Sequence, residues 1–104
     1  HDYTLGAFIP NKKYDAAWCC EFVEHVEEEY ICNFLETFKH SKYIIMTHAL
    51  PGQGGFHHVN EQISDYWISK IEKENFNYDH NTSLYLRNLT NAKWIKTLLF
   101  FSQC

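Results

Sequence analysis

The sequence predicts an α/β domain in which strands alternate with helices and form a mostly parallel sheet. Residues 14–20 form an apolar run with almost no polar interruption, a pattern typical of a strand covered on both faces. Residues 27–38 change to helical spacing, and residues 42–48 form a second apolar run. Strands that alternate with helices favour a parallel sheet, because parallel neighbours need crossover connections. We therefore expect helices packed on the faces of the sheet.

The remaining elements continue this alternation. The stretch PGQGG at residues 51–55 predicts a loop, and residues 64–74 have an amphipathic pattern that predicts a second helix. A short strand is expected at residues 76–79, followed by a short helix capped by Asn81 or Thr82. Aromatic and β-branched residues between positions 94 and 101 predict the last strand.

Size and charge limit the classes of function. The 104 residues, without repeats or a clear linker, predict one domain spanning residues 1–104. Lys and Arg number 9 against 13 for Asp and Glu, a net charge of -4, so binding to nucleic acid driven by charge is not expected. No apolar run is long enough to cross a bilayer and no secretion signal is recognisable, so we expect a cytoplasmic protein. The first residue is not Met, which leaves room for a longer parent chain.

Acidic and imidazole groups follow the first two predicted strands. In open α/β sheets ligands bind beyond the carboxyl ends of the strands. Glu21 follows the first strand and His48 ends the second, so both are expected to line one cleft. Glu21 and His25 are four residues apart and would share a face of a helical turn, where a carboxylate can orient an imidazole for proton transfer or metal binding. The alternative is a helix start with capping carboxylates and one partly buried histidine.

Two further interpretations concern the glycine-rich loop. A metal site made of Glu21, His25, His57 and His58 would need ligands that converge from two loops, and we predict no metal site from the spacing alone. The glycines match neither a dinucleotide-binding nor a phosphate-binding motif, so a tight loop with exposed His57 and His58 is the simpler interpretation.

Several stretches resemble class I S-adenosylmethionine-dependent methyltransferases. Residues 14–25 (YDAAWCCEFVEH) look like the fourth strand and following loop of that family, where a terminal E-x-x-E-H is common. Residues 47–60 (THALPGQGGFHHVN) and 65–68 (DYWI) resemble a subgroup of such proteins from microbes and their viruses. The resemblance implies a Rossmann-like fold with a mostly parallel sheet, flanking helices and an antiparallel last strand.

The resemblance also assigns roles to individual residues. Residues 1–4 (HDYT) look like the end of the family's third strand, so Asp2 would accept from the adenine amino group of S-adenosylmethionine and Tyr3 would pack on the adenine ring. Glu21 would lie near the methionine part of the cofactor. His25, His48, His57 and His58 are the candidates for a base that removes a proton from the methyl acceptor, whose identity is unknown.

One departure from the family affects both function and assembly. The first strand, the Gly-rich turn and the acidic residue that binds the ribose hydroxyls have no counterpart, so the fold is truncated relative to the family and this chain by itself would lack half of a cofactor pocket. We expect either part of a methyltransferase or, alternatively, a non-catalytic α/β interaction module that keeps the later part of the fold. A sheet edge left uncovered beside residues 14–20 predicts a homo-oligomer.

Overall fold

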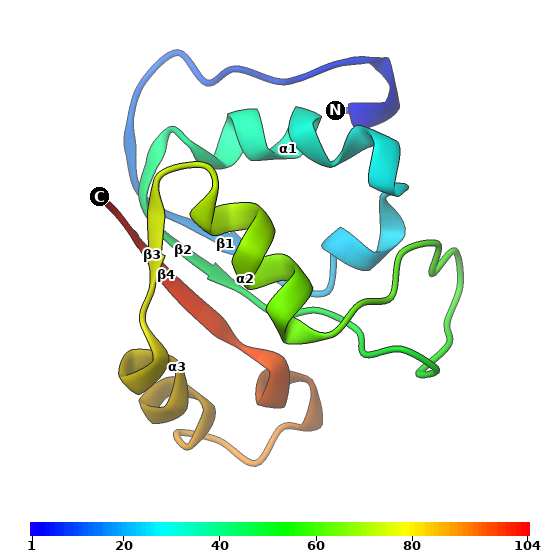
Figure 1. Ribbon diagram of the computed structural model, residues 1–104, viewed down its shortest axis with the longest axis vertical. Coiled ribbons are helices and arrows are strands. Elements are labelled where there is room, and N and C mark those ends of the chain that lie inside the picture. The colour runs from blue at the N-terminus through cyan, green and yellow to red at the C-terminus, as the bar shows by residue number, and fades with distance from the viewer.

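The computed structural model describes residues 1–104 and contains one four-stranded sheet in the order β1-β2-β4-β3. The strands are β1 (Tyr14–Cys19), β2 (Ser41–Met46), β3 (Phe76–Tyr78) and β4 (Leu99–Gln103). Only the β1–β2 pairing is parallel, while β4 is antiparallel to both β2 and β3. The expectation of a mostly parallel sheet was therefore wrong, because the last strand inserts in reverse between β2 and β3 (Figure 1). The expected antiparallel last strand is present.

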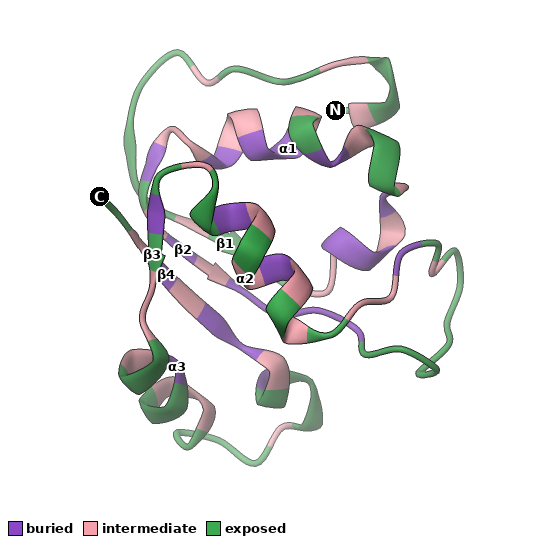
Figure 2. Ribbon diagram, viewed as in Figure 1, coloured by how far each residue is buried: buried purple, intermediate pink, exposed green.

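Two of the three helices build the core on one face of the sheet. The helices are α1 (Ile31–Phe38), α2 (Ser64–Glu72) and α3 (His80–Arg87). In Figure 1, α1 and α2 lie over the same face, and Figure 2 shows that their inner sides and the facing strand residues are buried. Phe34 of α1 and Trp67 of α2 pack against Ile44 of β2 and Phe101 of β4 in one hydrophobic cluster. None of the helices combines the length and apolar character that a membrane-spanning segment requires.

Among the predicted boundaries that differ from the structure, three have a clear local cause. The first α-helix starts at Ile31 and not at residue 27, because Glu28–Tyr30 forms a 3₁₀ turn before it. The third helix is capped by Asp79, whose side chain accepts from the amide of Thr82, so the cap lies before both predicted positions. The last strand starts at Leu99, since Lys93–Thr97 forms a 3₁₀ helix.

Strand β1 lies at the edge of the sheet. Tyr14, Ala16 and Trp18 are exposed, and Trp18 keeps 56% of its surface accessible. The prediction that this strand is covered on both faces was therefore wrong, because Tyr14, Ala16 and Trp18 project from one face of the strand and that face is exposed. A groove of about 560 Å³ runs along this edge, between β1 and an N-terminal stretch that includes Phe8 and Ile9. The chain thus leaves an apolar strand edge open to further pairing.

Candidate functional site

The segments that follow β1 and β2 are joined directly to each other. The amide of Thr47 donates to the carbonyl of Cys19 over 3.0 Å, which extends the parallel pairing by one step. The Thr47 hydroxyl then accepts from the amide of Glu21 over 3.0 Å. Glu21 has a φ of 48°, so the chain bends sharply where β1 ends. These contacts place the two loops side by side at the carboxyl end of the parallel pair.

Because of this bend, the predicted pairing of Glu21 and His25 on one helical face is absent. Glu21 and His25 do not share a face of an α-helix, because the chain between them turns at Glu21 and then forms a short 3₁₀ helix, Val23–His25. Glu21 instead lines a pocket of about 510 Å³ together with His48. The expected adjacency of these two residues is thus present, although its local geometry differs.

His48 is held as a buried structural residue. Its side chain is 1% exposed, its Nδ1 lies 3.1 Å from the carbonyl of Ala49, and its Nε2 lies 3.0 Å from the hydroxyl of Ser64. The carbonyl can only accept, so Nδ1 donates and Nε2 accepts from the serine. Burial lowers the pKa of His48 below its ordinary value of 6.5. A neutral ring with both nitrogens engaged is poorly placed to take a proton from a substrate.

Glu24 is the residue that ties the two loops together. Its side chain is fully buried, and Oε1 accepts from the amide of Ala49 over 2.9 Å. Its main-chain carbonyl accepts from the amides of Val59 and Asn60, each over 3.0 Å. The second carboxylate oxygen, Oε2, is buried without a hydrogen-bond partner. Burying a carboxylate oxygen without a hydrogen bond costs free energy, so a ligand that binds there or a functional role would explain its position.

Two imidazoles lie next to this carboxylate. His25 Nε2 is 3.5 Å from Glu24 Oε2, and the rings of His25 and His58 are 4.8 Å apart between centroids. His25 Nδ1 donates to the carbonyl of His57 over 3.1 Å. His58 Nδ1 donates to Glu61 Oε2 over 2.7 Å. Each ring is therefore oriented by its Nδ1, and its Nε2 remains without a hydrogen bond.

Glu61 also organises the glycine-rich loop. Its two oxygens accept from the amides of Gly52 and Gly54 over 3.1 and 2.8 Å. The hydrogen bond from His58 and then these two amides lower the pKa of Glu61 below its ordinary value of 4.5. The loop is consequently fixed by one carboxylate and holds His58 in place.

His57 lies outside this group. Its side chain is 55% exposed, and Nε2 is 3.7 Å from Glu27 Oε1. Only its main-chain carbonyl contacts the group, through His25. The structure therefore groups Glu24 with His25 and His58, whereas the set considered from the sequence was Glu21, His25, His57 and His58. The spacing E-x-x-E-H contained Glu24, but only its burial distinguishes it from its neighbours.

A second pocket contains the candidate adenine-binding residues. Asp2 and Tyr3 line a hollow of about 460 Å³ together with Phe22, His25 and His57. Asp2 Oδ1 accepts from both the amide and the hydroxyl of Thr4, which lowers the pKa of Asp2. Asp2 Oδ2 forms no hydrogen bond and is free to accept one.

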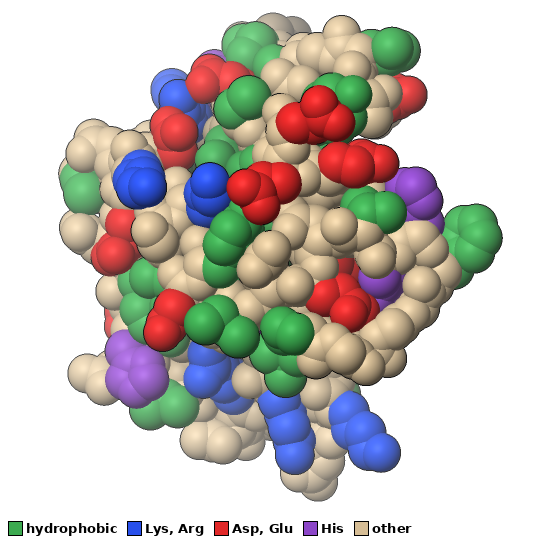
Figure 3. Space-filling view, turned by 45° about the vertical axis from the view of Figure 1, so that its right-hand side comes forward, with side chains coloured by type: hydrophobic (Ala, Val, Ile, Leu, Met, Phe, Trp, Pro, Cys, Tyr) green, Lys and Arg blue, Asp and Glu red, His purple; other side chains and the backbone are tan.

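Tyr3 is held in place by a hydrogen bond and by contacts of its ring. Its hydroxyl donates to Thr37 over 2.9 Å, and its ring lies edge-on to Phe22 and Phe34 with centroid distances of 6.0 and 6.3 Å. The N-terminal residues are thus packed onto α1 and the segment after β1. Figure 3 shows carboxylate and imidazole side chains gathered on the side of the molecule where these loops lie.

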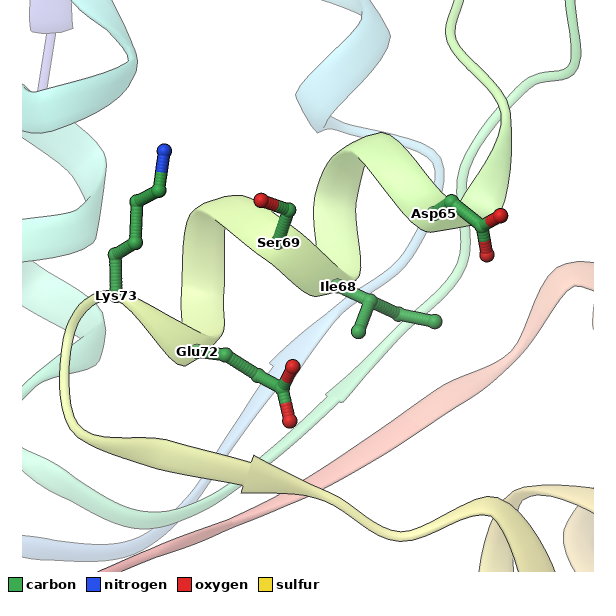
Figure 4. A pocket seen from close by; sticks show the side chains of 5 residues that line it. All are labelled: Asp65, Ile68, Ser69, Glu72 and Lys73. Atoms are coloured by element: carbon green, nitrogen blue, oxygen red, sulfur yellow. The ribbon is translucent and has the colours of Figure 1, made fainter.

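Another hollow lies on the outer side of α2. Its lining residues all come from this helix and the residue that follows it: Asp65, Ile68, Ser69, Glu72 and Lys73. Figure 4 shows that these side chains stand along one side of the helix and do not converge on a common point. No second element closes the hollow, so it provides no basis for a site.

No protein-family model, curated protein or solved structure matches this chain. The residues at the carboxyl ends of β1 and β2 are therefore the guide to function.

Proposed function

We propose that this chain is the later part of an S-adenosylmethionine-dependent methyltransferase domain, whose activity transfers a methyl group to an unidentified acceptor. One observation carries the proposal: Asp2 and Tyr3 line the same pocket as His25 and His57. These residues are far apart in the sequence, and the resemblance assigned them to adenine binding and to proton removal. Their meeting at the carboxyl end of β1 is the arrangement that such an assignment requires.

The sheet supports the proposal in a second way. β1, β2 and β3 run in one direction, since β4 is antiparallel to both β2 and β3 and β1 is parallel to β2. The reversed strand is the last one, as the resemblance implied. A fold hosts many functions, so this topology adds support but does not identify the reaction.

Methyl transfer requires little from the protein beyond alignment of the acceptor with the methyl group. The sulfonium of the bound cofactor supplies an activated methyl group, so the protein has to hold the acceptor in line and remove a proton where the acceptor carries one. Among the four candidate bases, His25 and His57 line the pocket that contains Asp2. Neither His48 nor His58 lines this pocket, and His48 is also buried. We therefore assign proton removal to His25 or His57.

Amide chemical shifts measured during titration with S-adenosylhomocysteine test this proposal. We expect shifts at Asp2, Tyr3, His25 and His57, with the fast exchange of weak binding, because this chain supplies only part of a pocket. Asp2→Asn keeps an oxygen for the turn with Thr4 and removes the charge, so it should weaken binding. Asp15→Asn, on the exposed edge strand, is the matched control. If millimolar S-adenosylhomocysteine caused no change in amide chemical shifts, the proposal would be wrong for this chain.

A non-catalytic interaction module is the second candidate. It is favoured by the apolar groove along β1, where Phe8, Ile9, Tyr14 and Trp18 are all at least 48% exposed. Exposed apolar surface of this kind marks interaction sites in soluble proteins. This candidate predicts self-association or partner binding with no response to S-adenosylhomocysteine, so the same titration separates the two functions.

A further inference from the structure

Glu24, His25 and His58 form a compact group of metal-ligating side chains. One ligand atom from each residue lies within 4.8 Å of the other two. Glu24 is fully buried, His25 is 37% exposed at its side chain and His58 only 12%. The group therefore has a buried inner end and one side that opens toward solvent through His25.

The distance between Glu24 Oε2 and His25 Nε2 fits two ligands of one metal ion. The 3.5 Å between Glu24 Oε2 and His25 Nε2 exceeds the usual length of a charge-assisted hydrogen bond, and no hydrogen bond joins the two atoms. A tetrahedral ion with ligand bonds of about 2.0–2.2 Å holds neighbouring ligand atoms about 3.3–3.6 Å apart. The two atoms already have the separation of ligands on one ion.

The outer contacts of the two imidazoles also match a metal centre. A ligating histidine usually donates its other ring nitrogen to a carbonyl or carboxylate, which fixes the tautomer and the ring orientation. His25 donates Nδ1 to the carbonyl of His57, and His58 donates Nδ1 to Glu61. Both rings are thus set in the tautomer that leaves Nε2 free to coordinate.

Room for the His58 ring depends on Gly55. A Cβ at this position would lie 2.8 Å from both Cε1 and Nε2 of His58. The absence of a side chain at Gly55 allows the ring to lie against the backbone, and Glu61 holds it there. The loop is therefore built around the position of this imidazole.

We propose that Glu24 Oε2, His25 Nε2 and His58 Nε2 bind a divalent transition-metal cation of the Zn²⁺ class. Two imidazoles and one carboxylate suit Zn²⁺ better than Mg²⁺ or Ca²⁺, which prefer sites made of oxygens alone. Three protein ligands leave a coordination position for water or for an oxygen of a bound molecule. The inference rests on these residues alone and does not depend on methyl transfer. With the ion bound, His25 Nε2 is occupied, which leaves His57 as the candidate base.

Titration of the full chain with Co²⁺ as a spectroscopic substitute for Zn²⁺ tests the site. Cys20, Cys32 and Cys104 are exposed thiols, so the experiment uses a background in which all three are serine. We expect one ion per chain, with the visible absorption of a tetrahedral nitrogen and oxygen site. Stoichiometric Zn²⁺ should bleach this absorption, whereas excess Mg²⁺ should leave it unchanged.

Variants separate a metal site from a structural ion pair. Glu24→Gln keeps an oxygen for the amide of Ala49 while removing the carboxylate, and Glu61→Gln weakens the outer support of His58. Loss of an outer partner is expected to reduce metal affinity by about 10–100-fold, and loss of Glu24 by at least as much. His25→Gln provides a second ligand deletion if Glu24→Gln does not fold. His80→Ala is the matched control, because this exposed histidine at the start of α3 lies outside the group, and it should keep the affinity within about twofold.

Three outcomes would overturn the proposal. The first is the absence of bound Co²⁺ or Zn²⁺ in the background without exposed cysteines. The second is binding that Glu24→Gln and His25→Gln leave unchanged, which would place the ion elsewhere. The third is displacement of Co²⁺ by Mg²⁺ at equal concentration, which would contradict the class of ion.

Discussion

Glu24 accepts a buried hydrogen bond of 2.9 Å from the amide of Ala49, so one carboxylate joins the segment after β1 to the segment after β2. The partners are 25 residues apart in the sequence and neither is exposed. We predict that Glu24→Ala lowers the free energy of unfolding by about 1–3 kcal/mol, because the amide of Ala49 is left buried and unpaired.

Urea denaturation followed by circular dichroism measures this effect. Glu24→Gln is the comparison, since its side-chain oxygen can still accept from Ala49, and it should lose clearly less stability than Glu24→Ala. Equal losses in the two variants would show that the hydrogen bond does not hold the loops together.

Gly55→Ala should disturb the loop through His58. The new Cβ would lie 2.8 Å from the ring, and the φ of Gly55 is 152°, which residues with a side chain rarely adopt. We expect a loss of about 1–3 kcal/mol from backbone strain, together with displacement of the His58 ring. Gly52→Ala is the control, because its φ of 84° is also strained but no atom lies within 4 Å of its Cβ position. The imidazole resonances of His58 should move in Gly55→Ala and stay in place in Gly52→Ala.

His48 should make stability depend on pH. Burial lowers its pKa in the folded state below the ordinary value of 6.5, so the unfolded chain binds this proton first as the pH falls. Stability rises with pH wherever the unfolded state binds more protons. The contribution of the neutral ring is therefore fully present above the unfolded pKa and is lost as the pH falls toward the folded one.

Denaturation at several values between about pH 7.5 and about pH 5.5 checks this sign. The decrease in stability toward acid should be smaller in His48→Gln than in the unmodified chain. The other histidines are common to both proteins and cancel in the comparison. A steeper decrease in the variant would contradict the inferred direction of the shift.

The exposed edge at β1 predicts self-association. We expect a dimer or larger assembly by light scattering, because an unpaired strand edge flanked by apolar side chains favours pairing with another copy. Trp18→Glu, at a side chain that is 56% exposed on this edge, should shift the equilibrium toward monomer. Leu89→Glu changes a residue that is 62% exposed after α3 and should have no effect. A stable monomer at high concentration would contradict the prediction.

The order of strands and helices was predictable from the sequence, since apolar runs and helical spacing are local signals. The burial of β1 was not predictable, because residues 14–20 look equally apolar whether the strand is central or at an edge. The last strand was started too early at Trp94, whose neighbour Ile95 is buried by a 3₁₀ turn and not by strand pairing. Local composition does not report the position of a strand within its sheet.

The candidate site was likewise predictable from the sequence only in part. The adjacency of Glu21 and His48 followed from strand direction, since both residues lie at carboxyl ends of parallel neighbours. The link between Glu24 and Ala49 did not follow, because its partners belong to different loops. The side chain of His58 is 12% exposed, whereas that of the neighbouring His57 is 55% exposed, and residue type alone does not separate them. Three-dimensional burial decides which of the acidic and imidazole groups act together.

The central position of β4 constrains the route by which this protein forms. β3 pairs only with β4, and β4 is the last of the four strands to be synthesised. While β4 is still inside the ribosome, β3 has no partner and one side of β2 is open, although β1 and β2 can already pair. Completion of the sheet must therefore follow translation of residues 99–103, and until then the nascent chain exposes apolar strand edges to whatever binds them first.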